Sequence, residues 1–463
     1  MQFDLVIQGG KVVFPEGSVQ EADLAVREGK IAGVLEKGAG AGLEAREVVA
    51  ADGLYVFPGV VDPHQHMGIY NPAAEDFDRE TAAAALGGTT TIVNYYRGKD
   101  SYLASVPPLI EEGERLSRVD FALSLGLLRQ LHLEELELYA RELGVTSYKF
   151  YRNYQDNVGR IFAVEDPLTL DGADELEILR RFEKISVELV LCVHCEDMDI
   201  QRKTERALRQ GVVEDSLGFF AQTSPDYGES VSLLETLYLR RLTSAKVYVV
   251  HLSAARSVRL LEENAWLWSE GVTVETCPHY LVLDTDAPCG LLGKVNPPIR
   301  EAFNKEVLWE GLRKGIITAI GSDNCPSSLA KKYGKGRDVW NTLPGFPGSG
   351  AILPLMLSEG YHKRGLELPL IARATSAAPA RALGLWPQKG NIAVGADADL
   401  VLVDLDREQA LSHAWFGEDG YSVYDGLPIK GWPVMTIGRG EIIAREGKVL
   451  APPGRGRYLR RRV

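Results

Sequence analysis

The sequence predicts an α/β protein with a parallel sheet in its large middle part and a small β domain built from both chain ends. Helix-then-strand units repeat through residues 57–385, whereas residues 3–35 and 396–450 read as short strands joined by Gly-containing turns. Neither end supplies enough strands for a stable core, so we expect the two ends to combine. A chain of 463 residues is long enough for one large domain and a smaller companion.

The middle part alternates helical and strand segments in a regular order. In one unit, Gly87 and Gly88 stop the helical run 80–86 before a strand at 89–93. Further predicted helices at 133–143, 176–185 and 232–242 precede strands at 146–150, 189–193 and 246–250. The length of this region favours an eight-stranded (β/α) barrel over an open sheet, although the pattern alone does not decide between them.

The composition argues against several classes of protein. A net charge of -13 disfavours a general phosphate-binding surface, so we expect no nucleic-acid partner. No stretch reaches the roughly 18 apolar residues of a membrane span, and the N-terminus shows no secretory signal. The 5 cysteines form an odd, sparse set, which favours a reducing compartment. We therefore expect a cytoplasmic protein that does not contact a membrane.

Two histidines, His64 and His66, follow an apolar stretch that is typical of a buried strand. Residues i and i+2 of a strand point to the same face, so both imidazoles can bind one metal ion. An isolated pair of this kind is more often just two polar residues at a strand end. Whether the pair binds metal therefore depends on the ligands that the rest of the chain supplies.

Further polar residues end other apolar runs, and in chain order they are Lys149, His194, His251 and Asp323. Barrel enzymes carry their chemistry at the carboxyl ends of the strands, so we expect these side chains to share one site with the histidine pair. Four imidazoles and an acid exceed what one tetrahedral zinc requires, which favours two metal ions. An unmodified lysine cannot bind a cation, but carboxylation would turn its amine into a bridging oxygen ligand.

Motifs spread over nearly the whole chain accompany these residues. They are Glu75-Asp76-Phe77, residues 87–92, the Lys149 strand, His194 with Glu196, His251-Leu252-Ser253, and residues 275–281, 297–300, 321–323 and 390–399. As a set they resemble the amidohydrolase superfamily, in particular the cyclic amidohydrolases hydantoinase and dihydropyrimidinase, with allantoinase and dihydroorotase as relatives. The resemblance implies a (β/α)8 TIM-type barrel of residues 57–385. It also implies a small β-sandwich of residues 1–56 with 386–450, followed by a C-terminal arm, residues 451–463.

The resemblance assigns the strand-end residues to two divalent ions, which we expect to be zinc. The ligands of the more buried ion would be His64, His66 and Asp323. Those of the second ion would be His194 and His251. A carboxylated Lys149 would bridge the two ions.

The implied reaction is hydrolysis of a C–N bond in a cyclic amide or imide, with ring opening by a metal-bridging hydroxide. Two ions lower the pKa of the bridging water and polarise the carbonyl. Asp323 would take the proton and pass it to the leaving ring nitrogen. Tyr154 matches the family's tyrosine that hydrogen-bonds the oxyanion. Asn296 stands where the family commonly has a serine that binds the ring amide partly through its backbone, and we expect Asn296 to contact the substrate.

The change at Asn296 leaves the identity of the small-molecule substrate open. Gly68 stands where dihydroorotases usually carry an arginine, which counts against dihydroorotate. Arg97 and Arg152, each just past a strand end, are the remaining residues that could hold an acidic substrate group. The alternatives are an allantoinase, another lactam or dihydroorotase-like hydrolase, and a non-catalytic assembly module. The six competent ligand positions count against the module, and the resemblance further implies a homotetramer.

Overall fold

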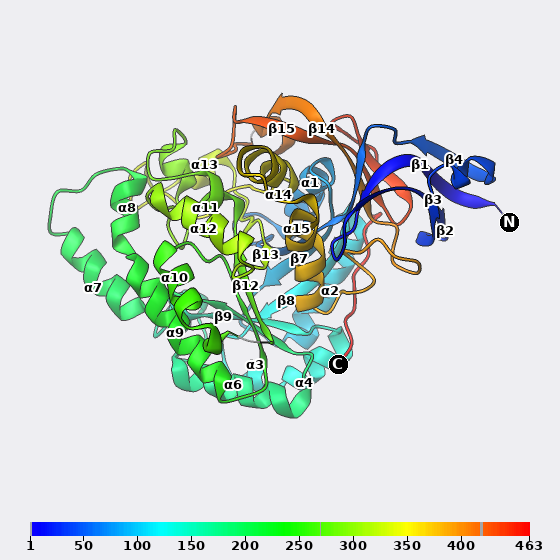
Figure 1. Ribbon diagram of the computed structural model, residues 1–463. Helices are drawn as coiled ribbons and strands as arrows, with labels where there is room; N and C mark the ends of the chain where they lie inside the picture. Colours follow the sequence, from blue (N-terminus) through cyan, green and yellow to red (C-terminus); the bar gives the residue numbers. More distant parts are fainter. Residues whose placement is uncertain (1, 269, 417–419) are drawn as a thin grey trace.

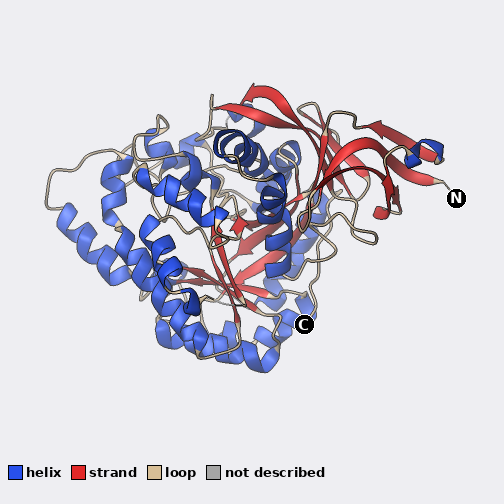
Figure 2. Cartoon of the chain, viewed as in Figure 1, coloured by secondary structure: helices blue, strands red, loops and turns tan. Residues whose placement is uncertain are grey.

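The computed structural model describes residues 2–268, 270–416 and 420–463 (Figure 1). In this part of the chain the strands form two sheets, and helices surround one of them (Figures 1 and 2). One sheet has eight parallel strands and the other has nine strands from both chain ends. None of the helices in these ranges combines the length and the hydropathy that a membrane span needs.

The eight-stranded sheet forms the barrel, and each strand is parallel to the next. Its strands are β6 (Val60–Gln65), β7 (Thr89–Tyr96), β8 (Asp120–Gly126), β9 (Ser147–Tyr151), β10 (Val190–His194), β11 (Lys246–Val249), β12 (Val272–Thr276) and β13 (Ala319–Ile320). A bridge between Gln65 and Asn324 brings the two edge strands together, and the His66 amide donates to the Asn324 carbonyl at 2.7 Å. The predicted barrel is confirmed.

Helices lie outside the barrel between successive strands (Figure 2). The longer ones are α1 (Ala73–Leu86), α2 (Tyr102–Leu116), α6 (Gly172–Ile185), α7 (Met198–Leu208), α9 (Asp226–Arg241), α10 (Ala255–Glu263) and α12 (Phe303–Arg313). The shorter ones are α3 (Gln130–Glu134), α4 (Leu136–Leu138), α5 (Val158–Phe162), α8 (Leu217–Thr223), α11 (Pro278–Val282), α13 (Leu329–Lys332), α14 (Ile352–Leu355), α15 (Leu368–Ala372) and α16 (Ala378–Ala382). The single helix predicted over 133–143 is wrong: Glu135 leaves helical geometry (φ -95°, ψ 4°), and a π-helical turn, Tyr139–Leu143, follows α4.

The nine-stranded sheet joins the two chain ends. Its strands are β1 (Phe3–Val13), β2 (Val19–Arg27), β3 (Lys30–Glu36), β4 (Ala45–Ala50), β5 (Tyr55–Pro58), β14 (Leu400–Ala410), β15 (Pro428–Gly438), β16 (Glu441–Arg445) and β17 (Lys448–Val449). Strand β5 pairs with β1 on one side and with β14 on the other. Leu5, Leu24, Leu400 and Ile437 share one buried apolar cluster in this sheet. The combination of both ends is confirmed, whereas the exact domain limits stay a prediction.

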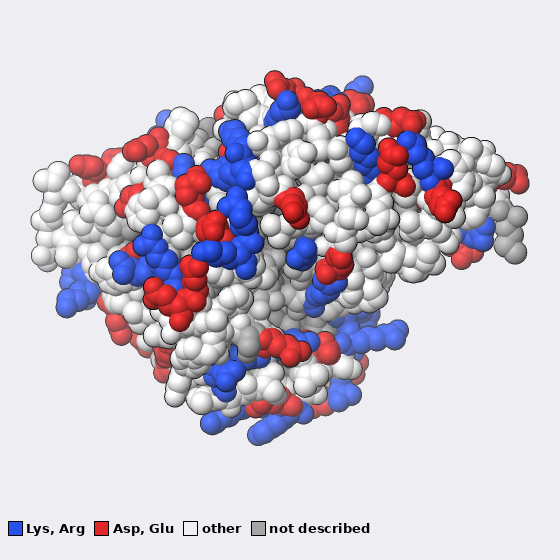
Figure 3. Space-filling model, in the orientation of Figure 1, with Lys and Arg blue, Asp and Glu red and all other residues white. Residues whose placement is uncertain are grey.

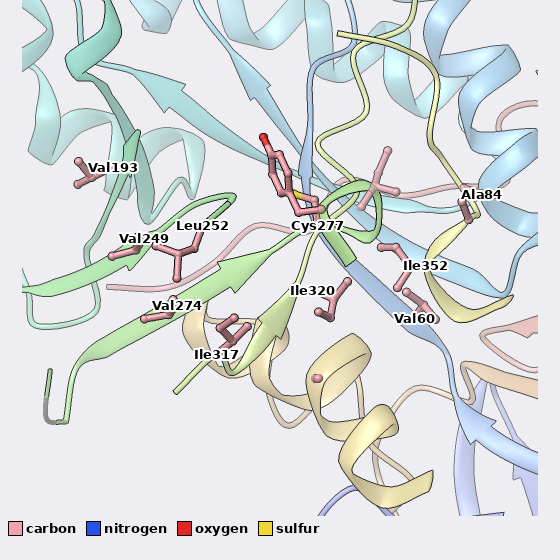
Figure 4. Close-up of a cluster of buried hydrophobic side chains, with 14 of the residues drawn as sticks. Val60, Ala84, Val193, Val249, Leu252, Val274, Cys277, Ile317, Ile320 and Ile352 are labelled. Carbon is pink, nitrogen blue, oxygen red and sulfur yellow. The ribbon is translucent and has the colours of Figure 1, made fainter. Parts of the chain in front are cut away.

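The main hydrophobic core fills the space between the barrel and its helices. Figure 4 shows part of it, with Val249, Val274 and Ile320 on neighbouring strands and Ile352 of α14 beside Ile320. The chain after β17 returns to the barrel, where the Leu459 amide donates to the Phe121 carbonyl at 2.7 Å. On the face in Figure 3, Lys and Arg side chains alternate with Asp and Glu, so this face carries no broad patch of one sign.

Candidate metal centre

His64, His66 and Asp323 converge at one end of the barrel. The two histidine Nε2 atoms lie 3.2 Å apart, and Asp323 Oδ1 is 3.4 Å from the first and 3.3 Å from the second. His64 lies in β6, while Asp323 follows β13 in a left-handed conformation (φ 50°). One ligand atom from each residue lies within 4.8 Å of the others. This spacing suits three ligands of a single metal ion.

Lys149 extends from β9 into the same end of the barrel. Its side chain is 1% exposed, and its Nζ has no hydrogen-bond partner among the described residues. The ring centroids of Tyr95 and Tyr151 lie 5.1 and 5.6 Å from its Nζ. Burial lowers the pKa of Lys149 to about 8, because a buried ammonium loses its hydration. The amine therefore loses its proton more readily than an exposed lysine.

His194 and His251 lie beside the group formed by His64, His66 and Asp323, but they are not part of it. The His251 ring centroid is 4.4 Å from that of His194 and 5.5 Å from that of His64. Nε2 of His194 lies 2.5 Å from Glu196 Oε2, and the Ser224 hydroxyl donates to the other oxygen of this carboxylate. Glu196 therefore orients the His194 ring. Ring contacts therefore connect the four predicted histidine ligands: His64 contacts His66 and His251, and His251 contacts His194.

The charge states in the centre suit metal binding. Burial lowers the pKa of His64, His66 and His251, which keeps these imidazoles neutral. Burial alone would raise the pKa of Asp323, but His64 and His66 hold it below its usual range. Neutral imidazoles and an ionised carboxylate are the forms that coordinate a cation.

Glu275 is a site residue that the sequence analysis assigned no role. It lies in β12 with no exposed surface, and its Oε1 accepts hydrogen bonds from His64 Nδ1 at 2.9 Å and from the His251 amide at 3.0 Å. Tyr248 donates to its second oxygen at 2.9 Å. The carboxylate therefore orients the His64 ring with Nε2 toward the centre. A Cβ on Gly321 would lie 2.6 Å from Glu275 Oε2, so this position leaves room for the carboxylate.

A cavity of about 90 Å³ opens in front of the centre. Its walls include His66, Lys149, His194, His251 and Asp323. Tyr154 and Asn296, which the sequence analysis predicted to contact substrate, line the same cavity. Arg97 lines it as well, and its Nη1 donates to the Tyr154 hydroxyl at 2.6 Å. All the predicted metal and substrate residues except His64 therefore border one cavity, and His64 lies behind His66 and Asp323.

A (β/α)8 barrel with histidines, a lysine and an aspartate at its strand ends has the architecture of a barrel hydrolase. The Amidohydrolase family model matches residues 156–443, and the chain belongs to this family. The chain is 32% identical to the D-hydantoinase of Geobacillus stearothermophilus, covering 98% of this chain and 96% of the relative. It is 33% identical to the allantoinase of Deinococcus radiodurans over the whole of both chains. A crystal structure of dihydropyrimidinase from Brevibacillus agri superposes with a TM-score of 0.88 at 30% identity, covering 99% and 98% of the two chains. The resemblance to cyclic amidohydrolases is confirmed.

Proposed function

We propose that this protein hydrolyses a C–N bond in a cyclic amide or imide and so opens a hydantoin-like or dihydropyrimidine-like ring. The observation that carries the proposal is the convergence of His64, His66 and Asp323 beside the cavity that Tyr154 and Asn296 line. The named hydantoinase and dihydropyrimidinase relatives support the same reaction. The allantoinase relative makes allantoin the second candidate substrate.

Two divalent ions, which we propose to be zinc, fit the side chains of the centre. One ion would be held by His64, His66 and Asp323. The other would be held by His251 and by Nδ1 of His194, since Glu196 bonds its Nε2. When bound, two such ions would activate a water molecule and polarise the amide carbonyl.

Lys149 fits as a carboxylated ligand between the two ions. Its buried Nζ has no hydrogen-bond partner among the described residues, and an unpaired buried ammonium is costly. Its lowered pKa favours the neutral amine, which is the form that reacts with carbon dioxide. The product carries two oxygen atoms that can contact both ions, which the ammonium cannot do.

The chain's own residues then move protons and stabilise charge. Asp323, ionised by its low pKa, accepts a proton at its carboxylate and returns it to the departing ring nitrogen. Arg97 fills one acceptor position on the Tyr154 oxygen, so the Tyr154 O–H can donate to the oxyanion that develops on the substrate carbonyl. Asn296 lines the cavity and would bind the ring amide.

Metal analysis combined with a substrate panel tests this proposal. We expect about two metal ions per chain, because the proposed centre holds two divalent ions. We also expect ring opening of hydantoin or dihydropyrimidine, followed by ultraviolet absorbance. The Asp323→Asn variant should lose activity while its circular dichroism stays unchanged. Opening of allantoin alone would select the second candidate, and a metal-free protein that opens no ring would support the assembly module.

We further propose a cytoplasmic homotetramer. The 5 free cysteines support a reducing compartment. Helix α9 carries Tyr227, Val231, Leu234 and Tyr238 along one face at helical spacing, each between 41 and 54% exposed. An exposed apolar stripe of this kind suits a contact between copies of the chain. Light scattering should report four chains, and Leu234→Glu should lower the mass if this face is the contact.

A further inference from the structure

Arg97 follows β7 and contributes a guanidinium group to the cavity in front of the metal centre. Its guanidinium carbon lies 5.4 to 5.5 Å from the ring centroids of Tyr151, Tyr154 and Phe162. Gly126 makes room for this arrangement, because a Cβ there would lie 3.1 Å from the Arg97 Cβ and 3.1 Å from the Tyr151 ring. The three rings therefore hold the guanidinium in place at the cavity wall.

In the part of the chain that the structure describes, no carboxylate neutralises this cation. In the described ranges 2–268, 270–416 and 420–463, no Asp or Glu oxygen lies within 4 Å of an Arg97 nitrogen. Among the described residues, Asp323 is the one carboxylate that lines the cavity, and its Oδ1 lies 3.4 and 3.3 Å from Nε2 of His64 and His66 rather than within 4 Å of an Arg97 nitrogen. Among the residues that the structure describes, this permanently charged arginine therefore faces the cavity without a counter-ion.

Arg152, which also follows a barrel strand, differs from Arg97 because two carboxylates neutralise its charge. Its Nε donates to Glu175 at 2.8 Å and its Nη1 to Glu235 at 2.7 Å. It is buried beneath these two carboxylates and does not line the cavity. Of the two arginines that could hold an acidic group, only Arg97 is therefore placed to contact a substrate.

We propose that Arg97 binds a carboxylate carried by the cyclic substrate, so the preferred substrates are acidic cyclic amides. The inference rests on the proposed ring hydrolysis and names the substrate class of that site. The planar fork of a guanidinium matches the two oxygens of a carboxylate. Arg97 would then hold the carboxylate while its bond to Tyr154 places that hydroxyl over the reacting carbonyl.

Two matched substrates separate these roles: a hydantoin with a carboxymethyl group on its ring carbon, and the carboxamide of the same shape. Wild type, Arg97→Met, Arg97→Lys and Tyr154→Phe are compared by kcat and KM on both. We expect wild type to prefer the acid. In Arg97→Met the acid-to-amide ratio of kcat/KM should fall about 10- to 100-fold, mainly through KM, which is the range for a charged hydrogen bond. Arg97→Lys should retain part of the preference.

Tyr154→Phe is the control for a purely positioning role of Arg97. It should lower activity on both substrates and leave their ratio unchanged. If Arg97→Met likewise lowers both substrates equally, the carboxylate site is refuted and Arg97 only positions Tyr154. If wild type opens the amide and shows no preference for the acid, this inference fails while the proposed function stands.

Calorimetry can measure how tightly the Asp323→Asn variant binds the acid. This measurement tests the inference separately from turnover. Weaker binding in the Arg97→Met double variant supports the subsite. Equal binding overturns it. If wild type opens neither ring, the proposed function fails, and this binding comparison still reports on Arg97.

Discussion

Replacing Lys389 with methionine should destabilise the protein, because this lysine neutralises three aspartates where the barrel meets the terminal sheet. Its side chain is 1% exposed, and its Nζ lies 2.6 Å from Asp120, 2.9 Å from Asp397 and 2.8 Å from Asp399. Asp120 begins β8, whereas Asp399 directly precedes β14. These carboxylates raise the pKa of Lys389 against the opposing effect of burial. The ammonium therefore links two separate sheets.

The size of the effect follows from what remains after the substitution. Among the described residues, the other cations within 4 Å of these aspartates are Arg439, 3.3 Å from Asp120, and Lys30, 2.8 Å from Asp397. Removing one partner of a buried ion pair costs about 3–5 kcal/mol. Unfolding entropy is about 2.1 cal/mol/K per residue, or about 1 kcal/mol/K for a chain of this length. If the chain unfolds in one step, Tm should fall by about 3–5 °C.

Lys30→Met is the matched control, because Lys30 also contacts Asp397, at 2.8 Å, but its side chain is 51% exposed. An exposed pair contributes at most about 1 kcal/mol, so Tm should change by about 1 °C or less. Differential scanning calorimetry of both variants beside wild type measures the difference. Equal Tm values for Lys389→Met and Lys30→Met would refute the reasoning that the buried lysine stabilises the junction.

Three further substitutions test the site and its surroundings. Glu275→Gln should weaken metal binding about 10- to 100-fold, because the amide orients His64 less strongly than the carboxylate does. Competition with a chelator measures the metal affinity, and an unchanged affinity would contradict this role of Glu275. Tyr154→Phe should lower kcat about 100-fold with a smaller change in KM, whereas a change in KM alone would exclude oxyanion stabilisation. Burial lowers the pKa of Lys332 to about 7 from 10.5, so across this window the unfolded chain holds a proton that the folded chain lacks. The free energy of unfolding of wild type should therefore rise with pH relative to Lys332→Met by about 1.4 kcal/mol per unit; parallel pH profiles would contradict it.

The barrel and the cavity-facing polar residues could be predicted because they depend on local patterns. Several of the apolar strands end in a polar residue or are followed by one, and parallel strands bring those ends to one side of the barrel. Glu275 carries the same signal, since it lies near the end of β12. Its role was not predicted because its partner His64 is 211 positions away in the sequence. A hydrogen bond between distant strands leaves no periodic trace in either segment.

The two arginines show most directly where local patterns stop being informative. Arg97 and Arg152 both follow a strand end, so the sequence treats them alike as candidates for an acidic substrate group. Their difference arises from helices α6 and α9, which supply Glu175 and Glu235 to Arg152 and supply no carboxylate to Arg97. A buried guanidinium with two carboxylates stabilises the fold, whereas one that faces a cavity can bind a ligand. Substrate preference in this protein therefore depends on which arginine the surrounding helices leave without a counter-ion, and the Arg97→Met comparison measures that dependence.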